Sequence, residues 1–486
     1  MDMKLKSMGL VGVGMVAGVA LSLQFSAFAQ RAAGSPLPLD ELRQLADVYG
    51  IIKSDYVEPV DDKKLLQEAI SGMVASLDPH SVYLDAKAFR EMRENVAGKF
   101  VGLGIEVASE DGYVKIVSPI EDSPAFRAGI KSGDLITRID STPIKGMSLD
   151  DAIKRMRGAP GSKVVLTVAR RGEDKPLIFP LVRAEVHVQS VKAKVIEPGY
   201  GWLRISQFQE STLDDMAAKV KWLYQQDPNL KGLVLDLRND PGGLLPGAVG
   251  VSAAFLPKDQ EIVSTIGQLP DSNQVFYGRK EFYASRAGND PLVGLPEQIK
   301  KVPMVVLVNT GSASASEIVA GALQDYKRAI VMGTQTFGKG SVQTLRQLTA
   351  DTAVKLTTAR YYTPNKRSIQ ARGIVPDLMV DETPNGDGLN ALRVREVDLD
   401  KHLSNVATPV TDKGHRDALE EEQRMAALDR ARKPVEFGGA DDFQLTQALN
   451  HFKGKPVQLS KAEPRPEQPE AQPKAKPDTK PAELHK

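Results

Sequence analysis

The stretch Ser312–Glu317, which reads S-A-S-A-S-E, could supply a nucleophile. Its middle serine, Ser314, follows an apolar run at Met304–Val308 that is typical of a buried strand, and it begins a stretch of helical composition. Free N–H groups and the helix dipole would stabilise an oxyanion beside Ser314. The simpler interpretation is a capping box, in which Ser314 and Glu317 only begin a helix. The local sequence leaves both interpretations open.

A serine nucleophile needs a base that takes its proton. The nucleophile-elbow motif G-x-S-x-G does not occur around any serine, and the S-x-x-K spacing of β-lactamase-like enzymes is absent too. None of the six histidines lies in such a context. These are His80, His187, His402, His415, His451 and His485.

A lysine remains as a candidate for the base. Lys339 lies in a glycine-rich loop after a second apolar run at Ala329–Met332. An unperturbed lysine has a pKa of ~10.4, and bringing it near neutrality takes about 4 kcal/mol of differential stabilisation of the neutral amine. Burial against Phe337 and the positive helix end beside Ser314 both act in that direction. A solvated surface charge is the ordinary alternative for a lone lysine.

Taken together, the strings S-A-S-A-S-E-I and T-F-G-K-G-S-V-Q resemble the carboxyl-terminal processing (tail-specific) proteases, which are serine peptidases with a Ser-Lys dyad. The resemblance extends over roughly residues 40 to 385. It implies that Ser314 is the nucleophile, that Lys339 is the general base, and that Gln343, four residues further on, supports the lysine. It implies no metal and no cofactor.

A second motif, L-R-N-D-P-G-G, ends a predicted buried strand at Gly232–Leu237. By themselves, two glycines at such a place need indicate nothing more than a sharp turn. In the family this turn faces the nucleophile, so the resemblance implies an oxyanion hole made by the backbone N–H groups of Ala315 and Gly243, or Gly242. The family often has Asn where this chain has Asp240, a change that affects a side chain and leaves the backbone donors in place.

The elements that must position these residues alternate between strands and helices, which predicts an α/β core with a mostly parallel sheet. The resemblance implies a crotonase/ClpP-like spiral of ββα units for this protease core, assigned to residues 184–385. Fold analogy alone would also admit crotonase-like acyl-CoA chemistry. The predicted export and the accessory domain described next argue against that chemistry.

Residues 97–183 resemble a PDZ domain, a mixed β-sandwich with helices inserted before the core. The signature is a G-L-G-I loop, then A-G-I-K-S-G-D, then an amphipathic helix at Leu149–Met156 and a closing strand at Lys163–Ala169. A PDZ domain adds an extended peptide to a sheet edge. The resemblance implies that the loop N–H groups capture a terminal carboxylate, although a lone G-L-G would indicate only a tight turn. The loop residues are Gly102, Leu103, Gly104 and Ile105.

The remaining regions are terminal. Lys4 and Lys6, an apolar run at Met8–Leu23 and the A-F-A at Ala27–Ala29 predict a secretory signal peptide at residues 1–29, and an uncleaved membrane anchor is the alternative. Residues 30–96 form a predicted helical region, which could pack on the core or dimerise. Residues 386–454 are predicted to be helical, with helices at 389–405, 418–431 and 443–452, and the Pro/Lys/Glu-rich residues 455–486 are predicted to be disordered.

The amino-acid composition limits the kinds of partner and chemistry that this chain can have. A net charge of +1 on 486 residues, without a basic stripe, argues against a nucleic-acid partner, and the absence of cysteine excludes disulfides and thiol catalysis. The sequence therefore predicts an exported, periplasmic Ser-Lys endopeptidase that recognises protein C-termini and forms homo-oligomers. Whether an adaptor protein delivers substrates stays open. The competing prediction is an inactive scaffold that binds C-terminal tails through its PDZ domain.

Overall fold

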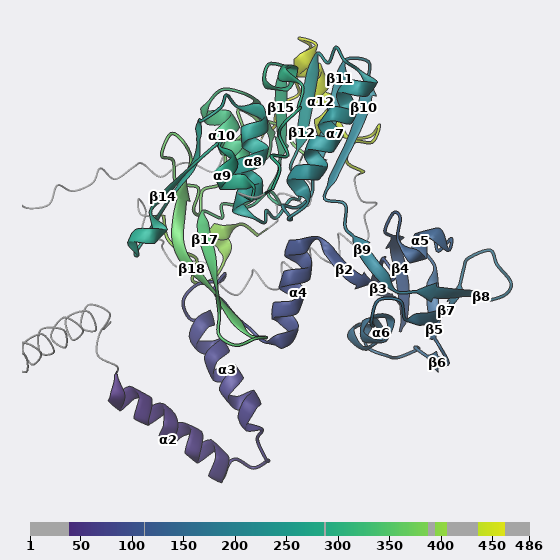
Figure 1. The fold of residues 1–486 in the computed structure, drawn as a ribbon, viewed down its shortest axis with the longest axis vertical. Coiled ribbons are helices and arrows are strands. Elements are labelled where there is room, and N and C mark those ends of the chain that lie inside the picture. The colour runs from purple at the N-terminus through teal and green to yellow at the C-terminus, as the bar shows by residue number, and fades with distance from the viewer. Residues whose placement is uncertain (1–37, 111, 286–287, 387–393, 406–435, 462–486) are drawn as a thin grey trace, which may run out of the picture. The chain divides into compact units, whose positions relative to one another are not determined.

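The computed structural model describes residues 38–110, 112–285, 288–386, 394–405 and 436–461 (Figure 1). The chain divides into two compact units, residues 1–70 and 71–486. The predicted signal peptide and the helix predicted at residues 418–431 lie outside the described residues. In the ranges that are described, no helix has both the length and the apolar composition needed to cross a membrane.

The first unit contains the helix α2 (Leu39–Asp55) and most of the helix α3 (Asp62–Ala75). The amine of Lys53 lies 2.5 Å from a carboxylate oxygen of Asp62, which joins the two helices. None of the residues of α2 is buried, and its apolar side chains face outward along most of its length.

The PDZ-like domain of the second unit is built on an antiparallel sheet with the order β3-β4-β5-β7-β8. A two-stranded ribbon of β2 and β9 carries the chain into this domain and out of it. Ile116, Ile136 and Leu166 are fully buried in its core. The elements are β2 (Lys99–Gly102), β3 (Ile105–Glu110), β4 (Tyr113–Pro119), α5 (Pro124–Arg127), β5 (Leu135–Ile139), β6 (Thr142–Pro143), α6 (Leu149–Met156), β7 (Lys163–Ala169), β8 (Leu177–Val182) and β9 (Ala184–His187).

The core contains a six-stranded sheet with the order β10-β11-β12-β15-β16-β19, in which every neighbouring pair after β10-β11 is parallel. The predicted α/β class is therefore confirmed. The strands are β10 (Val191–Glu197), β11 (Tyr200–Ile205), β12 (Gly232–Asp236), β15 (Met304–Val308), β16 (Ile330–Gly333) and β19 (Leu378–Met379).

Helices cover both faces of this sheet, because its central strands are apolar on both sides. Leu233 and Leu235 of β12 pack with the helices α7 (Thr212–Gln226), α8 (Leu245–Phe255) and α10 (Ala315–Asp325). Val234, which points to the other side, packs with α12 (Phe443–Phe452). Since β12 and β15 are adjacent and parallel, the loops that follow them begin at the same edge of the sheet (Figure 1).

The loop that follows β16 leads into a second, antiparallel sheet. Its order is β1-β18-β13-β14, and β17 also pairs with β18. The insertion predicted at residues 257–295 as a loop or hairpin contains the β13-β14 hairpin. The elements are β1 (Val82–Leu84), α4 (Ala86–Ala97), β13 (Glu261–Gly267), η1 (Pro270–Ser272), β14 (Gln274–Tyr277), α9 (Lys280–Tyr283), η2 (Glu297–Lys300), β17 (Ser341–Gln347) and β18 (Ala353–Tyr362).

The C-terminal region differs from the prediction in two places. Residues 394–405 contain the short 3-10 helix η4 (Glu396–Asp398) and no α-helix, because their backbone and side chains bond to the core: the N–H of Glu396 donates to the carbonyl of Phe337. Residues 455–461, predicted to be disordered, also pack on the core, since the N–H of Ser460 donates to the carbonyl of Met379. The rest of the predicted tail lies outside the described residues.

Candidate active site

Ser314 lies in a tight turn between β15 and α10. Its backbone angles are φ 55° and ψ −113°, a left-handed region that a residue with a side chain rarely adopts. Such strain persists only where neighbouring contacts fix it. Here the N–H of Ser314 donates to Oε2 of Glu317 over 2.8 Å, and the predicted capping box between the two residues is present. The backbone of Ser314 differs from the extended conformation of an ordinary N-cap.

The two outer serines of the S-A-S-A-S run hold this turn against the loop that follows β12. The hydroxyl of Ser312 donates to the carbonyl of Leu237 over 2.8 Å, and the hydroxyl of Ser316 donates to the carbonyl of Asp240 over 2.9 Å. Both side chains are buried. The alternation of serine and alanine thus places the hydroxyls of Ser312 and Ser316 in contact with the loop after β12.

The loop after β12, residues 237–243, packs directly on the turn of Ser314. Gly242 has φ +92°, and a Cβ at this position would lie 2.8 Å from the nitrogen of Ala315 and 2.8 Å from Cβ of Ser314. Only glycine fits such an approach. The N–H of Gly242 donates to Oδ1 of Asp240 over 2.8 Å. The N–H groups of Gly243 and Ala315, in contrast, donate to no atom in the described ranges of the chain.

Glu317 joins the turn of Ser314 to the loop of Lys339. Its carboxylate is fully buried and accepts from the N–H of Gly338 over 2.7 Å and the N–H of Lys339 over 3.0 Å, besides the N–H of Ser314. Thr336 adds a hydroxyl donor at 2.6 Å. Burial raises the pKa of Glu317 to about 7, and the four donors oppose that shift.

The side chain of Lys339 is half-buried and, within the described residues, its amine has neither a hydrogen bond nor an ion pair. Burial first, and the positive charge of Lys355 second, lower its pKa below the ordinary lysine value. No hydrogen bond joins this amine to the hydroxyl of Ser314. In unliganded enzymes, hydrogen bonds between catalytic groups are often long and shorten only when substrate binds.

Tyr361 lies between the two predicted dyad residues. Its buried hydroxyl donates to the carbonyl of Lys339, and an interaction with the side chain of Ser314 acts on its pKa. Burial raises that pKa well above the ordinary value, so the phenol stays protonated. Tyr361 belongs to β18, where the alternating sequence predicted a strand and no role in the site.

Gln343 is on β17, and its amide donates to the hydroxyls of Ser341 over 3.0 Å and Thr357 over 3.3 Å. Thr357 in turn donates to a carboxylate oxygen of Asp78 over 3.0 Å. The structure therefore brings Gln343 into a polar network with Asp78, a buried residue that the sequence motifs did not single out.

The short C-terminal segment at residues 394–405 packs on the loop of Lys339. The buried carboxylate of Glu396 lies 2.7 Å from Nε2 of His80 and accepts from the amide of Gln370 over 2.8 Å. The side-chain oxygen of Gln370 accepts from the N–H of Gly340 over 3.0 Å. These contacts fix the residue that follows Lys339.

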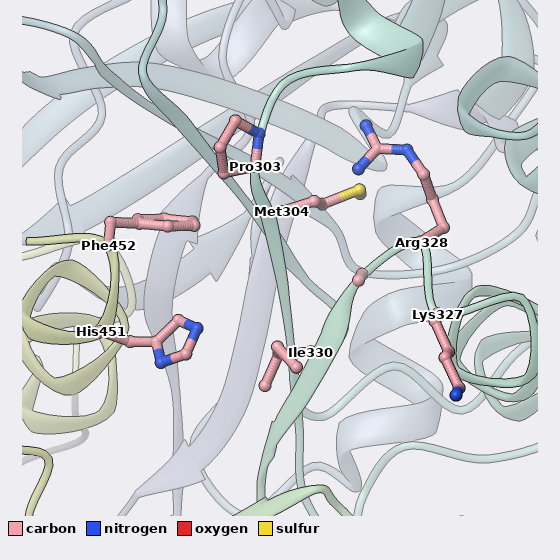
Figure 2. Close-up of a pocket in the computed structure, with 8 residues that line it drawn as sticks. Pro303, Met304, Lys327, Arg328, Ile330, His451 and Phe452 are labelled. Carbon is pink, nitrogen blue, oxygen red and sulfur yellow. The ribbon is translucent and has the colours of Figure 1, made fainter. Parts of the chain in front are cut away.

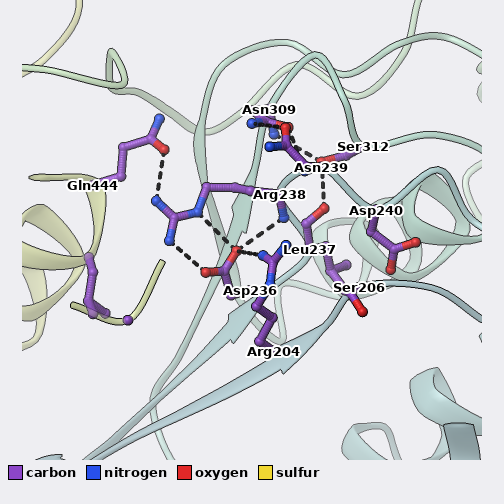
Figure 3. Close-up of polar contacts among 12 residues, drawn as sticks. Arg204, Ser206, Asp236, Leu237, Arg238, Asn239, Asp240, Asn309, Ser312 and Gln444 are labelled. Carbon is purple, nitrogen blue, oxygen red and sulfur yellow. Dashed lines mark hydrogen bonds and ion pairs between the residues drawn. The ribbon is translucent and has the colours of Figure 1, made fainter. Parts of the chain in front are cut away.

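A buried charge cluster supports the loop after β12 (Figure 3). The guanidinium of Arg238 is fully buried and lies 2.5 Å from a carboxylate oxygen of Asp236 and 2.6 Å from one of Asp442. Its Cζ is 4.2 Å from the centre of the Phe437 ring. Asp442 and Phe437 come from the C-terminal segment 436–461, so this segment completes the surroundings of the loop. Neither residue carried a signal in the sequence.

The predicted peptide-binding loop connects β2 to β3. Leu103 is buried, and its carbonyl and that of Gly104 accept backbone hydrogen bonds from Ala125 and Ile120. The N–H groups of Leu103 and Gly104 have no acceptor in the described parts of the chain. Gly102 ends β2 and Ile105 begins β3, which lies at the edge of its sheet. This arrangement leaves a strand edge and two donors open to a peptide.

A hollow of about 310 Å³ lies elsewhere, between the start of β15 and α12 (Figure 2). It is lined by Pro303 and Met304 on one side and by His451 and Phe452 on the other. Ser314 follows the opposite end of β15. The hollow therefore contributes nothing to the site around Ser314.

Comparison with known proteins identifies the family. Family models match a peptidase of family S41 over residues 199–380, a PDZ domain over 115–170 and the N-terminal domain of the activating protease CtpB over 18–88. A carboxy-terminal-processing protease of Bartonella bacilliformis is 45% identical, over 76% of this chain and 82% of its own length. The chain belongs to peptidase family S41.

Two further proteins are similar over most of the chain. A probable CtpA-like serine protease of Staphylococcus aureus is 34% identical, over 91% of this chain and 86% of its own length. The solved photosystem II D1 C-terminal processing protease is 29% identical, with a TM-score of 0.40 over 74% of this chain and 91% of its own. The chain is thus a carboxy-terminal-processing serine protease with a PDZ domain, and the predicted family, fold and enzyme class are confirmed.

Proposed function

We propose that this S41 protease is an endopeptidase that uses Ser314 as its nucleophile and Lys339 as its general base. The observation that carries the proposal is the pair of unengaged N–H groups, of Gly243 and Ala315, on two turns that touch beside the strained Ser314. Backbone donors placed in this way stabilise the oxyanion of a tetrahedral intermediate. The N–H of Gly242 is engaged by Asp240, so we assign the hole to Gly243 and Ala315.

In the proposed reaction, neutral Lys339 takes the proton of Ser314 while the serine oxygen attacks the carbonyl carbon of the scissile bond. The carbonyl oxygen becomes an oxyanion that accepts from Gly243 and Ala315. The lysine then gives its proton to the leaving amine, and water releases the acyl group by the same steps. Gln343 holds the strand that follows the lysine, through Ser341 and Thr357.

Substrate selection is assigned to the PDZ domain. The open N–H groups of Leu103 and Gly104 fit the carboxylate of a protein C-terminus, and the free edge of β3 fits the residues before it. The basic, apolar and A-x-A sequence of residues 1–29 supports export as a signal peptide, and hence periplasmic substrates.

The test measures cleavage of an unfolded reporter protein by the purified full chain. We expect Ser314→Ala and Lys339→Ala each to abolish cleavage, because the two groups act as a unit. Circular dichroism checks that both variants are folded. A reporter with an amidated C-terminus should be cleaved more slowly than one with a free carboxylate. A wild-type chain that binds the free tail and never cleaves it would favour the inactive scaffold.

We also propose that the chain assembles with itself through α2. Helices in proteins gain most of their stability by packing an apolar face, and no residue of α2 is buried. Its exposed stripe includes Leu42, Leu45 and Val48, which suits the same stripe on a second copy. Sedimentation analysis of the wild type and of Leu45→Lys tests this, since the charged variant should shift toward the monomer. Equal masses for both proteins would refute it.

A further inference from the structure

Asp240 is a buried carboxyl group between the two turns, and the proposed mechanism does not use it. Its carbonyl accepts from the N–H of Ala313 and the hydroxyl of Ser316, both over 2.9 Å, and its Oδ1 accepts from the N–H of Gly242 over 2.8 Å. Its Oδ2 is buried and has no hydrogen-bond partner in the ranges that the structure describes. An ionised carboxylate can only accept, so its charge would be poorly compensated here.

In the part of the chain that the structure describes, no cation forms an ion pair with Asp240. Asp236 and Asp442 already pair with Arg238, and Arg204 lies 3.3 Å from Asp236. Figure 3 shows the carboxyl group of Asp240 apart from this cluster. The charged groups that face it are Arg204 on β11 and Asp236 at the end of β12, which have opposite signs, whereas α10 presents the uncharged Ser316.

We propose that Asp240 serves as an uncharged carboxylic acid in the oxyanion turn, and that its ionisation switches the enzyme off. The inference rests on the proposed function, because it concerns the same pair of donors. Asp240 is a positioning residue: as a neutral group it holds Gly242, and thereby Gly243, in place. Once ionised, it sets a negative charge beside the position where the oxyanion must form, and the attraction of the donors for that oxyanion is weakened.

The pKa of Asp240 places its ionisation within the pH range of an ordinary enzyme assay. Burial raises the pKa of Asp240 to about 8, although the hydrogen bonds from Gly242 and Ser316 and the charge of Arg204 act against that shift. The group is therefore protonated at neutral pH and ionised in mild alkali.

The experiment compares the pH dependence of kcat/KM for the wild type and Asp240→Asn, with fluorescein-labelled casein as substrate. In the wild type the rate rises as Lys339 loses its proton and then falls about tenfold per pH unit as Asp240 ionises. Asp240→Asn should keep the rise and lose the fall, and at the alkaline end it should exceed the wild type by at least about tenfold.

Asp227→Asn is the matched control. Asp227 also accepts from the N–H two residues further on, at 3.0 Å from Asn229, but it follows α7, away from the site. This variant should keep the falling limb. An alkaline fall that persists in Asp240→Asn, or its absence from the wild type, overturns the inference while the protease assignment stands. A wild type without Ser314-dependent cleavage overturns both.

Thermal unfolding provides a second readout that needs no activity. The pKa of Asp240 is raised in the folded state, so the stability that the protonated group contributes is present at acid pH and is lost as pH rises towards about 8. The Tm of Asp240→Asn relative to the wild type should therefore increase from acid pH to pH 8. A constant difference between the two proteins would contradict the proposal.

Discussion

The hydroxyl of Ser316 donates a hydrogen bond to the carbonyl oxygen of Asp240 over 2.9 Å. This bond links the first turn of α10 to the loop after β12, and the N–H of Ala313 reaches the same carbonyl. Ser312 makes a parallel link to Leu237. The turn that carries Ser314 and the turn that carries the free N–H of Gly243 therefore act as one rigid unit.

The three serines of the run should differ in what they contribute. Ser316→Ala removes one buried hydrogen bond and Ser312→Ala removes two, since the hydroxyl of Ser312 also accepts from the N–H of Asn309. Each lost bond should lower the free energy of unfolding by about 1 kcal/mol, and both variants should reduce kcat/KM only modestly. Ser314→Ala should reduce kcat/KM by more than about a thousandfold with little change in stability. Urea unfolding and reporter cleavage measure both quantities. A loss of activity in Ser316→Ala as large as in Ser314→Ala would mean that the roles are misassigned.

Gly242 should tolerate no side chain. In Gly242→Ala the new Cβ meets the nitrogen of Ala315 and Cβ of Ser314, so the two turns must separate and the oxyanion hole should be lost. We expect kcat/KM to fall by about a hundredfold or more. Gly247→Ala, whose Cβ would lie 3.4 Å from Phe208, is the control and should remain active. Comparable activity of the two variants would contradict the close packing of the turns.

The positive charge of Lys355 should affect the pKa of Lys339, the proposed general base. Lys355 is half-buried, and its positive charge lowers the pKa of Lys339. In Lys355→Met that pKa should rise, so the acid limb of the kcat/KM profile should move to higher pH. Lys355→Arg keeps the charge and should leave the limb near its wild-type position. If both variants move the limb equally, then packing and not charge is responsible.

The C-terminal segment should be essential to the stability of the core. Asp442→Ala leaves the buried Arg238 with one carboxylate in place of two, which should cost about 3–5 kcal/mol of unfolding free energy. Asp441→Ala changes the exposed neighbouring residue and is the control. Urea unfolding followed by circular dichroism compares the two. Equal midpoints would show that Asp442 does not support the cluster.

Local patterns were sufficient to predict the elements around Ser314. The apolar run at Met304–Val308 and the glycines at 242 and 243 indicate a strand and a turn by themselves, and parallel pairing of β12 with β15 then brings both turns together. The family resemblance singled out Ser314 and Lys339 as the residues for which activity should be tested.

The residues that support the site could not be predicted, since their role depends on contacts distant in sequence. Asp442 is 204 residues from Arg238, and Glu396 is 316 residues from His80. Glu317 resembled an ordinary capping residue, and only the fold shows that its second oxygen accepts from the loop of Lys339. The helix predicted at residues 389–405 is wrong over the described part, 394–405, for the same reason, because tertiary hydrogen bonds replace helical ones there.

The central claim is that Lys339 activates Ser314, and labelling with a fluorophosphonate tests it most directly. This reagent reacts with activated serines, and peptide mass spectrometry identifies the modified residue. We predict a single adduct on Ser314 in the wild type, and a loss of labelling in folded Lys339→Ala. An adduct on Ser312 or Ser316, or labelling of Lys339→Ala at the wild-type rate, would contradict the account.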